Sequence, residues 1–320
     1  RNWRVPPGPL PADPPTVLGF GKQGGFFRST EACNGAGVCR KTQGGAMCPS
    51  YRATRDEKDT TRGRANALRV ALSVEHGVRN VESKPEDALT GRWIHEVMDL
   101  CLSCKACKTE CPANVDVAKL KAEFLQAFYT DRARPLGHLA VKNIHRLSPL
   151  AARFANVNNW LVRRPFVRRI IESLAGIDRR RSLPELHREH FRRWFGRRPA
   201  QPAAARRVVL LDDCFTTFQE PQIGRAAVTL LERAGFTVEL AGVCCGRAMI
   251  SKGFLTDARE LARSGIAKLE RFAEAGVPIL GLEPSCILTL ADEWPELVPG
   301  SAAKRVASAT SLRPTAMALR

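Results

Sequence analysis

The feature that most constrains this chain is a run of four cysteines in the stretch "CLSCKACKTECP". Two residues separate Cys101 from Cys104 and Cys104 from Cys107, and Cys111 follows three residues later, directly before Pro112. Such gaps let one tight loop bring three thiolates to three irons of a four-iron, four-sulfur (4Fe-4S) cluster, and a closing Cys-Pro pair is typical of bacterial ferredoxins. The proline also suits the start of a following helix. The spacing predicts iron-sulfur chemistry.

A zinc site is the alternative interpretation, because CxxC pairs occur in both kinds of site. Structural zinc usually takes two separated Cys or His pairs, whereas this loop has three cysteines in one turn and then Cys-Pro. We therefore favour an iron-sulfur cluster over zinc.

An earlier stretch, "CNGAGVCRKTQGGAMCP", looks like the same motif with Ala36 where a second cysteine would stand. In two-cluster ferredoxins the last cysteine of each run ligates the other cluster. This crossing rule predicts two ligand sets, Cys48 with Cys101, Cys104 and Cys107, and Cys111 with Cys33 and Cys39. Because the second set has only three thiolates, two outcomes stay open. Either one complete cluster forms with three cysteines left over, or a three-iron or non-cysteine-ligated cluster accompanies it.

Four further cysteines, Cys214, Cys244, Cys245 and Cys286, lie in the last third of the chain. The first follows a predicted strand, the adjacent pair follows a second and the last follows a third. Since loops after parallel strands gather at one sheet edge, we expect that these four can converge on a metal or cluster. The alternative is that they are buried small hydrophobic residues or an inactive remnant.

The composition is globular, with 44% hydrophobic and 26% charged residues. No apolar run approaches the roughly 18 residues of a membrane span, and no export signal is visible. With eleven cysteines and no such signal, we expect a reducing, cytoplasmic setting with metal or cluster binding. The first fifteen residues hold six prolines and no initiating methionine, which is typical of a linker within a larger protein.

The net charge of +18 is local. Residues 132–198 contain seventeen Lys and Arg against four acids, a net charge of +13 in this one stretch. We expect its arginines to dock an acidic flavin domain, a partner subunit or an anionic membrane surface. A basic, zinc-stabilised nucleic-acid-binding protein is the competing hypothesis.

Periodicity predicts helices on both sides of the cysteines. One covers residues 60–77, one starts near Arg92, and one is capped by Asp116 and presents Leu120, Phe124, Leu125 and Phe128 on one face. From residue 206 strand and helix patterns alternate, which predicts an α/β domain with a mainly parallel sheet.

We therefore expect an α-helical ferredoxin-like iron-sulfur domain followed by an α/β cysteine-rich (CCG) domain, as a fragment of a larger protein. The expected organisation is a proline-rich linker (1–22), the helical 4Fe-4S domain (23–131), a basic helical linker (132–204), the CCG-type domain (205–298) and a low-order tail or truncated end (299–320).

The stretches "ACNGAGVCRK", "MCPSYRATRDEKDTTRGRANALR", "CLSCKACKTECPANVDVAKLKAEFL", "CCG" and "LEPSC" resemble the C-terminal iron-sulfur half of FAD-linked oxidases. These are of the D-lactate or D-2-hydroxyglutarate dehydrogenase type and are similar to the glycolate oxidase iron-sulfur subunit. The resemblance covers residues 20–290. Glu283 departs from the related CCG pattern, in which the last segment is CxxC, and this puts a cluster in that domain in doubt.

The resemblance implies an FAD domain or subunit that oxidises a D-2-hydroxy acid of the lactate, 2-hydroxyglutarate or glycolate type. This chain would relay its electrons towards a quinone or other acceptor, as an oxidoreductase component in the cytoplasm or peripherally on the inner face of the membrane. We expect no catalytic residue for bond-making in the chain itself, because no carboxylate pair, Ser/His/Asp set or phosphate loop stands out. A scaffold with a structural cluster is a further alternative.

Overall fold

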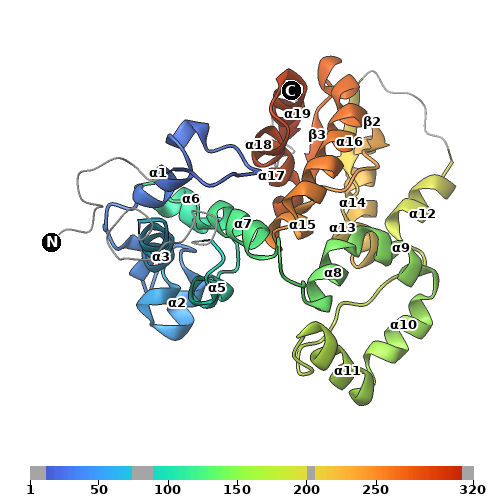
Figure 1. The fold of residues 1–320 in the computed structure, drawn as a ribbon. Coiled ribbons are helices and arrows are strands. Elements are labelled where there is room, and N and C mark those ends of the chain that lie inside the picture. Colours follow the sequence, from blue (N-terminus) through green and yellow to red (C-terminus); the bar gives the residue numbers. More distant parts are fainter. Residues whose placement is uncertain (1–11, 74–88, 200–205, 312–320) are drawn as a thin grey trace. The chain divides into compact units, whose positions relative to one another are not determined.

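The computed structural model describes residues 12–73, 89–199 and 206–311 of the chain (Figure 1). These residues form two compact units. The N-terminal unit comprises the described residues up to 133 together with 251–255, and the C-terminal unit comprises those of 134–250 and 256–311. Each unit is described by itself.

The N-terminal unit is built from short helices, drawn in blue to blue-green in Figure 1. They are α1 (Phe26–Glu31), α2 (Pro49–Thr54), α3 (Thr61–Ser73), α5 (Arg92–Asp99), α6 (Ala106–Glu110) and α7 (Val117–Phe128), with 3-10 turns η1 (Gly21–Gln23), η2 (Val38–Arg40) and η3 (Glu57–Asp59). The helices predicted on both sides of the cysteines are confirmed. The end predicted for α3, at Gly77, lies outside the described residues.

Helix α7 forms for the reasons that its sequence suggests. The Asp116 side chain accepts a hydrogen bond from the Lys119 amide at 3.0 Å, which satisfies one of the free amides at the helix start. The predicted apolar face of Leu120, Phe124, Leu125 and Phe128 is buried. Together with Phe26, Phe27, Met47 and Leu68 from the other helices, it makes the core of this unit.

The C-terminal unit begins with five helices in the basic stretch. They are α8 (Leu136–Lys142), α9 (Ile144–Arg153), α10 (Ala155–Val162), α11 (Pro165–Ala175) and α12 (Phe191–Arg197). Helix α11 starts at Pro165, which suits a first helical position, and ends at Gly176 in the left-handed conformation (φ 68°). The short helices predicted between the proline and glycine breaks are confirmed.

The rest of this unit alternates strands and helices, as predicted. Its elements are β1 (Arg206–Leu211), α13 (Cys214–Phe218), α14 (Pro221–Arg233), β2 (Phe236–Leu240), α15 (Arg247–Ser251), α16 (Leu255–Glu274), β3 (Ile279–Gly281), α17 (Pro284–Asp292), α18 (Trp294–Leu297), α19 (Ser301–Ala309) and β4 (Thr310–Ser311). The sheet order is β2-β1-β3-β4 and all neighbours are parallel. A small, fully parallel sheet therefore brings the ends of β1, β2 and β3 to one edge.

The sheet packs on a cluster of buried side chains from its strands and from α12 and α14: Phe191, Val208, Leu210, Val228, Phe236, Val238 and Leu280. Gly224 in α14 lets Phe191 come close, since a Cβ there would lie 2.7 Å from the ring.

The low-order tail expected from residue 299 is wrong for residues 301–311. These residues form α19 and then β4, which pairs with β3 through Thr310 opposite Ile279. Two strand residues are too few to carry an alternating pattern, so pairing with the existing sheet decides their conformation. The remainder of that predicted segment lies outside the described residues.

None of the helices that the structure describes has both the length and the apolar character needed to cross a membrane.

Candidate iron-sulfur sites

The loop that carries Cys101, Cys104 and Cys107 has an unusual backbone. Ser103 and Lys105 adopt left-handed conformations, with φ of 52° and 62°, immediately before and after Cys104. Left-handed residues other than glycine cost of order 1–3 kcal/mol each and persist where the surroundings fix them. This winding alternates with the three cysteines, as a loop must if it is to turn several thiols towards one place.

The Cys107 sulfur is the most enclosed of the three. Its residue is 9% exposed, and the backbone amides of Val117 and Ala118, in the first turn of α7, donate hydrogen bonds to the sulfur. Burial outweighs these amides and, with the negative charges of Asp116 and Cys101 nearby, raises the pKa of the Cys107 thiol to about 12. A helix N-terminus favours negative charge, so α7 is oriented to stabilise a thiolate or an anionic cluster here.

Cys48 reaches the same region from a distant part of the chain. The loop before it is held by Glu110 of α6, whose carboxylate accepts hydrogen bonds from the amides of Ala46 at 2.6 Å and Met47 at 3.1 Å. These bonds lower the pKa of Glu110. Since α6 also carries Cys107, the contact places the Cys48 segment beside the helix of the second cysteine run.

Arg64 of α3 is a buried cation at Cys48, and the sequence motifs did not reveal it. It is 1% exposed, and its Nη1 lies 3.6 Å from the Cys48 sulfur. The same guanidinium donates to the Asp59 carbonyl at 2.6 Å and to the Val97 carbonyl of α5 at 3.0 Å, and it forms an ion pair with the Asp59 carboxylate at 3.4 Å. Arg64 therefore ties Cys48 to the helix that leads into Cys101. An arginine within an otherwise Ala- and Leu-rich helix was the available signal.

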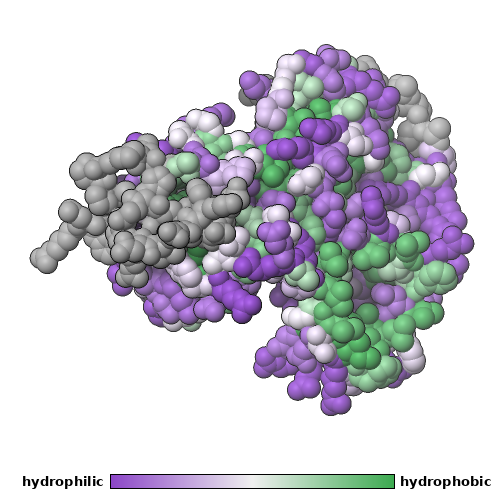
Figure 2. Space-filling model, viewed as in Figure 1, coloured by the Kyte–Doolittle hydropathy of each residue, from purple (hydrophilic) through white to green (hydrophobic). Residues whose placement is uncertain are grey.

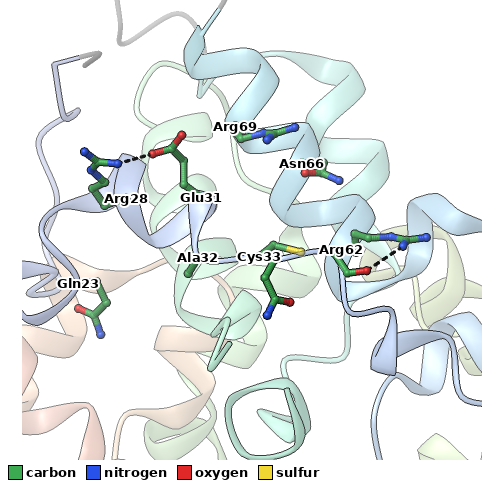
Figure 3. Close-up of a pocket in the computed structure, with 10 residues that line it drawn as sticks. Gln23, Arg28, Glu31, Ala32, Cys33, Arg62, Asn66 and Arg69 are labelled. Carbon is green, nitrogen blue, oxygen red and sulfur yellow. Dashed lines mark hydrogen bonds and ion pairs between the residues drawn. The ribbon is translucent and has the colours of Figure 1, made fainter. Parts of the chain in front are cut away.

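Cys33 and Cys39 lie near each other at the start of α3. The Cys39 sulfur accepts hydrogen bonds from the Arg62 amide and the Thr60 hydroxyl, yet burial dominates and raises its pKa. Cys33 lines a cavity of about 480 Å³ with three arginines and two side-chain amides among its walls (Figure 3). Its lining residues are Gln23, Arg28, Glu31, Ala32, Cys33, Asn34, Gly35, Arg62, Asn66 and Arg69.

Cys111, the third member of the second predicted ligand set, is placed by its backbone. Its amide donates to the Cys107 carbonyl at 3.1 Å and its carbonyl accepts from Asn114 at 2.9 Å. Among the described residues no hydrogen bond joins its thiol to Cys33 or Cys39. The structure thus brings Cys33 to Cys39, and Cys101 to Cys107, more directly than it brings Cys111 to either partner.

No three His, Cys, Asp or Glu side chains within the described ranges are arranged to hold a single metal ion. A 4Fe-4S cube makes a different demand, because each thiolate binds a different iron at a corner of the cube. The donor set of soft thiols, the wound loop and the amides directed at Cys107 fit such a cluster.

In the C-terminal unit the structure brings four cysteines together at the edge where the strands end. Cys214 starts α13 after β1, Cys244 and Cys245 follow β2, and Cys286 lies in α17 after β3. The Cys245 and Cys286 sulfurs are 3.1 Å apart, and hydrogen bonds from Cys214 and Cys245 converge on Cys244. The four sulfurs form a continuous chain of contacts.

These contacts divide the thiols into one anion and its donors. Hydrogen bonds from Cys214 and Cys245 lower the pKa of Cys244 to about 3, and the same hydrogen bonds raise the pKa values of Cys214 and Cys245. His145, which adds to the lowering, lines a cavity of about 410 Å³ together with Cys244.

Residues that sequence reasoning missed hold this edge in place. Asp212, at the end of β1, is buried; it accepts from the Gly242 amide at 2.8 Å and pairs with Arg192. Burial raises the pKa of Asp212. The Trp294 indole donates to the Cys245 carbonyl at 2.9 Å. Glu283, which stands where the CCG pattern has a cysteine, caps α17 through Ser285.

Comparison with known families matches this division. Residues 29–115 match the 4Fe-4S dicluster domain, and residues 208–291 match the cysteine-rich domain. The chain therefore contains an iron-sulfur dicluster domain followed by a cysteine-rich domain. No solved structure matches it significantly.

Curated relatives contain the same pair. The chain is 29% identical to the D-2-hydroxyglutarate dehydrogenase of Escherichia coli K12 over 84% of its own length and 30% of that protein. It is 29% identical to a subunit of the anaerobic glycerol-3-phosphate dehydrogenase of E. coli K12, over 52% and 44%. It is 26% identical to the E. coli glycolate oxidase iron-sulfur subunit, over 67% and 46%.

These matches confirm the predicted resemblance to the iron-sulfur and cysteine-rich half of FAD-linked oxidases. The chain spans about 30% of the length of the D-2-hydroxyglutarate dehydrogenases that it matches. All these relatives are dehydrogenases or parts of oxidases, which supports an oxidoreductase role.

Proposed function

We propose that this chain is the electron-relay portion of an FAD-linked dehydrogenase and that residues 23–131 hold its clusters. In this proposal Cys48, Cys101, Cys104 and Cys107 hold one 4Fe-4S cluster, and Cys33, Cys39 and Cys111 contribute to a second. The observation that carries the proposal is the convergence of two segments, since Glu110 and Arg64 hold Cys48 beside the loop whose Cys107 faces the start of α7. When bound, such a cluster gains and loses single electrons.

The role of the surrounding residues is to hold negative charge. The Arg64 guanidinium and the amides of Val117 and Ala118 offer positive charge to the sulfurs of Cys48 and Cys107. Lys105 and Lys108 add two cations on the loop and on α6. All of these favour the more negative, reduced state of a cluster and raise its reduction potential.

The electron donor in this proposal is a flavin that oxidises a D-2-hydroxy acid such as 2-hydroxyglutarate, lactate or glycolate. The names of the relatives support this choice, and the length of chain that they have beyond this segment leaves room for the flavin-binding part. The acceptor is a quinone or another carrier. The chain would act on the cytoplasmic side, docking a flavoprotein and touching an anionic membrane through its arginines.

For Cys214, Cys244, Cys245 and Cys286 the proposal is a second ligand set at the sheet edge. Their continuous contacts and the thiolate character of Cys244 support it, because thiolates are the form that binds iron or zinc. The alternative of buried, inert cysteines agrees with Glu283 taking the place of a fifth one.

The test is anaerobic reconstitution of the whole chain with iron and sulfide, followed by iron and sulfide quantification and EPR of the reduced protein. We expect a brown protein that gives an EPR signal on reduction and loses cluster in Cys48→Ser. A colourless product that contains zinc or no metal would contradict the proposal. A full cluster in Cys48→Ser would contradict the crossing assignment alone.

A further inference from the structure

Helices α8 to α11 expose most of their large apolar side chains. Of the twenty large hydrophobic residues that the described chain exposes, twelve lie between residues 136 and 174. Figure 2 shows the result as a broad hydrophobic area over the position of these helices in Figure 1. The twelve are Leu136, Leu139, Ile144, Leu147, Leu150, Phe154, Val157, Trp160, Leu161, Phe166, Ile170 and Leu174. We call them the apolar face.

The spacing of these residues is that of amphipathic helices. In α11, Phe166, Ile170 and Leu174 recur every four residues and therefore form one stripe. Such a stripe normally packs into a core, yet these three side chains are 51–59% exposed. The stripe is complete in the sequence and uncovered in the structure.

The four helices pack against one another through small residues instead. Ala152 and Ala155 are buried where α9 meets α10. Gly137 of α8 sits so close to α11 that a Cβ there would lie 2.3 Å from the Ala175 carbonyl oxygen. Large apolar groups point outward and small ones inward, the reverse of a helical layer that ends at water.

The charge around the apolar face identifies its occupant. Residues 134–176 contain eight Lys and Arg and one acid, Glu172. The exposed side chains of Arg146, Arg153 and Arg169 pair with no carboxylate among the described residues, and the Arg164 guanidinium stacks on the Trp160 ring at 4.2 Å. Basic amphipathic helices with aromatic residues on the apolar side suit the interface of an anionic bilayer.

We propose that α8–α11 form an interfacial membrane-binding surface, in which the apolar face enters the acyl-chain boundary and the arginines contact anionic phosphate headgroups. The helices are too short to span a bilayer, so they lie in its surface. This surface deepens the membrane contact of the proposed function and rests on it for its purpose, which is access to a membrane-soluble acceptor. Protein partners usually present an interface whose core is depleted of charge, whereas here arginines lie within the same short helices as every stripe.

The experiment is co-sedimentation of the full chain with phosphatidylcholine vesicles, with or without phosphatidylglycerol. We expect binding to the anionic vesicles that weakens with salt. The double variant Leu150→Ser/Phe154→Ser should bind on the order of tenfold more weakly or worse, because both side chains are more than 60% exposed and would leave the acyl region. Leu230→Ser is the matched control, since Leu230 is 66% exposed on α14, away from the apolar face, and this variant should bind like the wild type.

The triple variant Arg146→Gln/Arg153→Gln/Arg169→Gln should lose the preference for anionic vesicles and most of the salt dependence. Three results would overturn the surface: no sedimentation with either vesicle, equal sedimentation of the Leu150/Phe154 variant and the wild type, or an apolar-face variant that only dissolves a dimer of this chain. The visible absorbance of the same samples separates the two proposals. A colourless chain that binds vesicles refutes the electron relay, and a brown chain that ignores them refutes the surface.

Discussion

The two cysteine groups of this chain are held in opposite ways. In the N-terminal unit the thiols are separated and each is contacted from outside, by a helix start at Cys107 and by a buried guanidinium at Cys48. In the C-terminal unit the thiols contact one another, down to 3.1 Å between Cys245 and Cys286, and share protons among themselves. Separated thiols with external donors leave room for an inorganic core. Thiols in mutual contact form their own hydrogen-bond network.

The largest expected effect breaks this comparison at the cofactor. Cys104→Ser should remove the visible absorbance of the cluster in the N-terminal unit and its EPR signal, because it deletes a thiolate from the loop. Cys286→Ser, at an equally conservative change, should leave that signal in place. If both variants lose the same chromophore, the two groups do not act independently.

A large effect on stability is expected at Arg64. Arg64→Met leaves Asp59 as a buried, unpaired charge, and both side chains are 1% exposed, so we expect a loss of roughly 3–5 kcal/mol. The measurement is urea denaturation of iron-free protein, which keeps cluster loss out of the comparison. Arg69→Met on the same helix should change the free energy of unfolding by less than about 0.5 kcal/mol. Adding Asp59→Asn to Arg64→Met should recover part of the loss, and no recovery would argue against the buried pair.

A smaller effect should separate the C-terminal unit. Gly265 of α16 faces Trp294, and a Cβ would lie 2.3 Å from the ring, so Gly265→Ala should cost about 1–3 kcal/mol by overpacking. Because the indole holds the Cys245 carbonyl, alkylation of Cys245 should also become faster. The control is Gly196→Ala in α12, where a Cβ meets nothing within 4 Å. Unchanged alkylation in Gly265→Ala would show that Trp294 does not restrain this edge.

The smallest effect concerns pH and the N-terminal unit. Burial lowers the pKa of His95, which stacks on Phe128 with 4.6 Å between ring centroids. The unfolded chain then binds more protons than the native one as pH falls through 6.5, so the free energy of unfolding should fall in that window. His95→Phe should flatten this slope between pH about 7.5 and about 5.5 in urea titrations. An identical slope in the variant would assign it to other groups.

Much of this architecture follows from local pattern. The cap at Asp116, the stripe of α7 and the alternation from Arg206 onward are properties of neighbouring residues, and each was predicted. What could not be predicted depends on partners far away in sequence. Glu110 reaches back to Ala46 and Met47, and β4 exists because Thr310 meets the neighbouring strand.

The apolar face marks a second limit of sequence reasoning. The spacing of Phe166, Ile170 and Leu174 predicts a helix but says nothing about what its stripe faces. Only packing through Gly137 and the alanines shows that the stripe points outward. For the candidate clusters, spacing identified the cysteines, whereas the cation at Cys48 became visible only when α3 and α5 were placed together.

The contact of Arg64 with both Cys48 and α5 has a consequence for the life of the chain in a cell. Until iron arrives, two ligand segments that are 53 residues apart depend on this one guanidinium and on the Glu110 carboxylate to stay together. Metal insertion would add a covalent staple across that span, so iron supply would set how long newly made chains resist proteolysis.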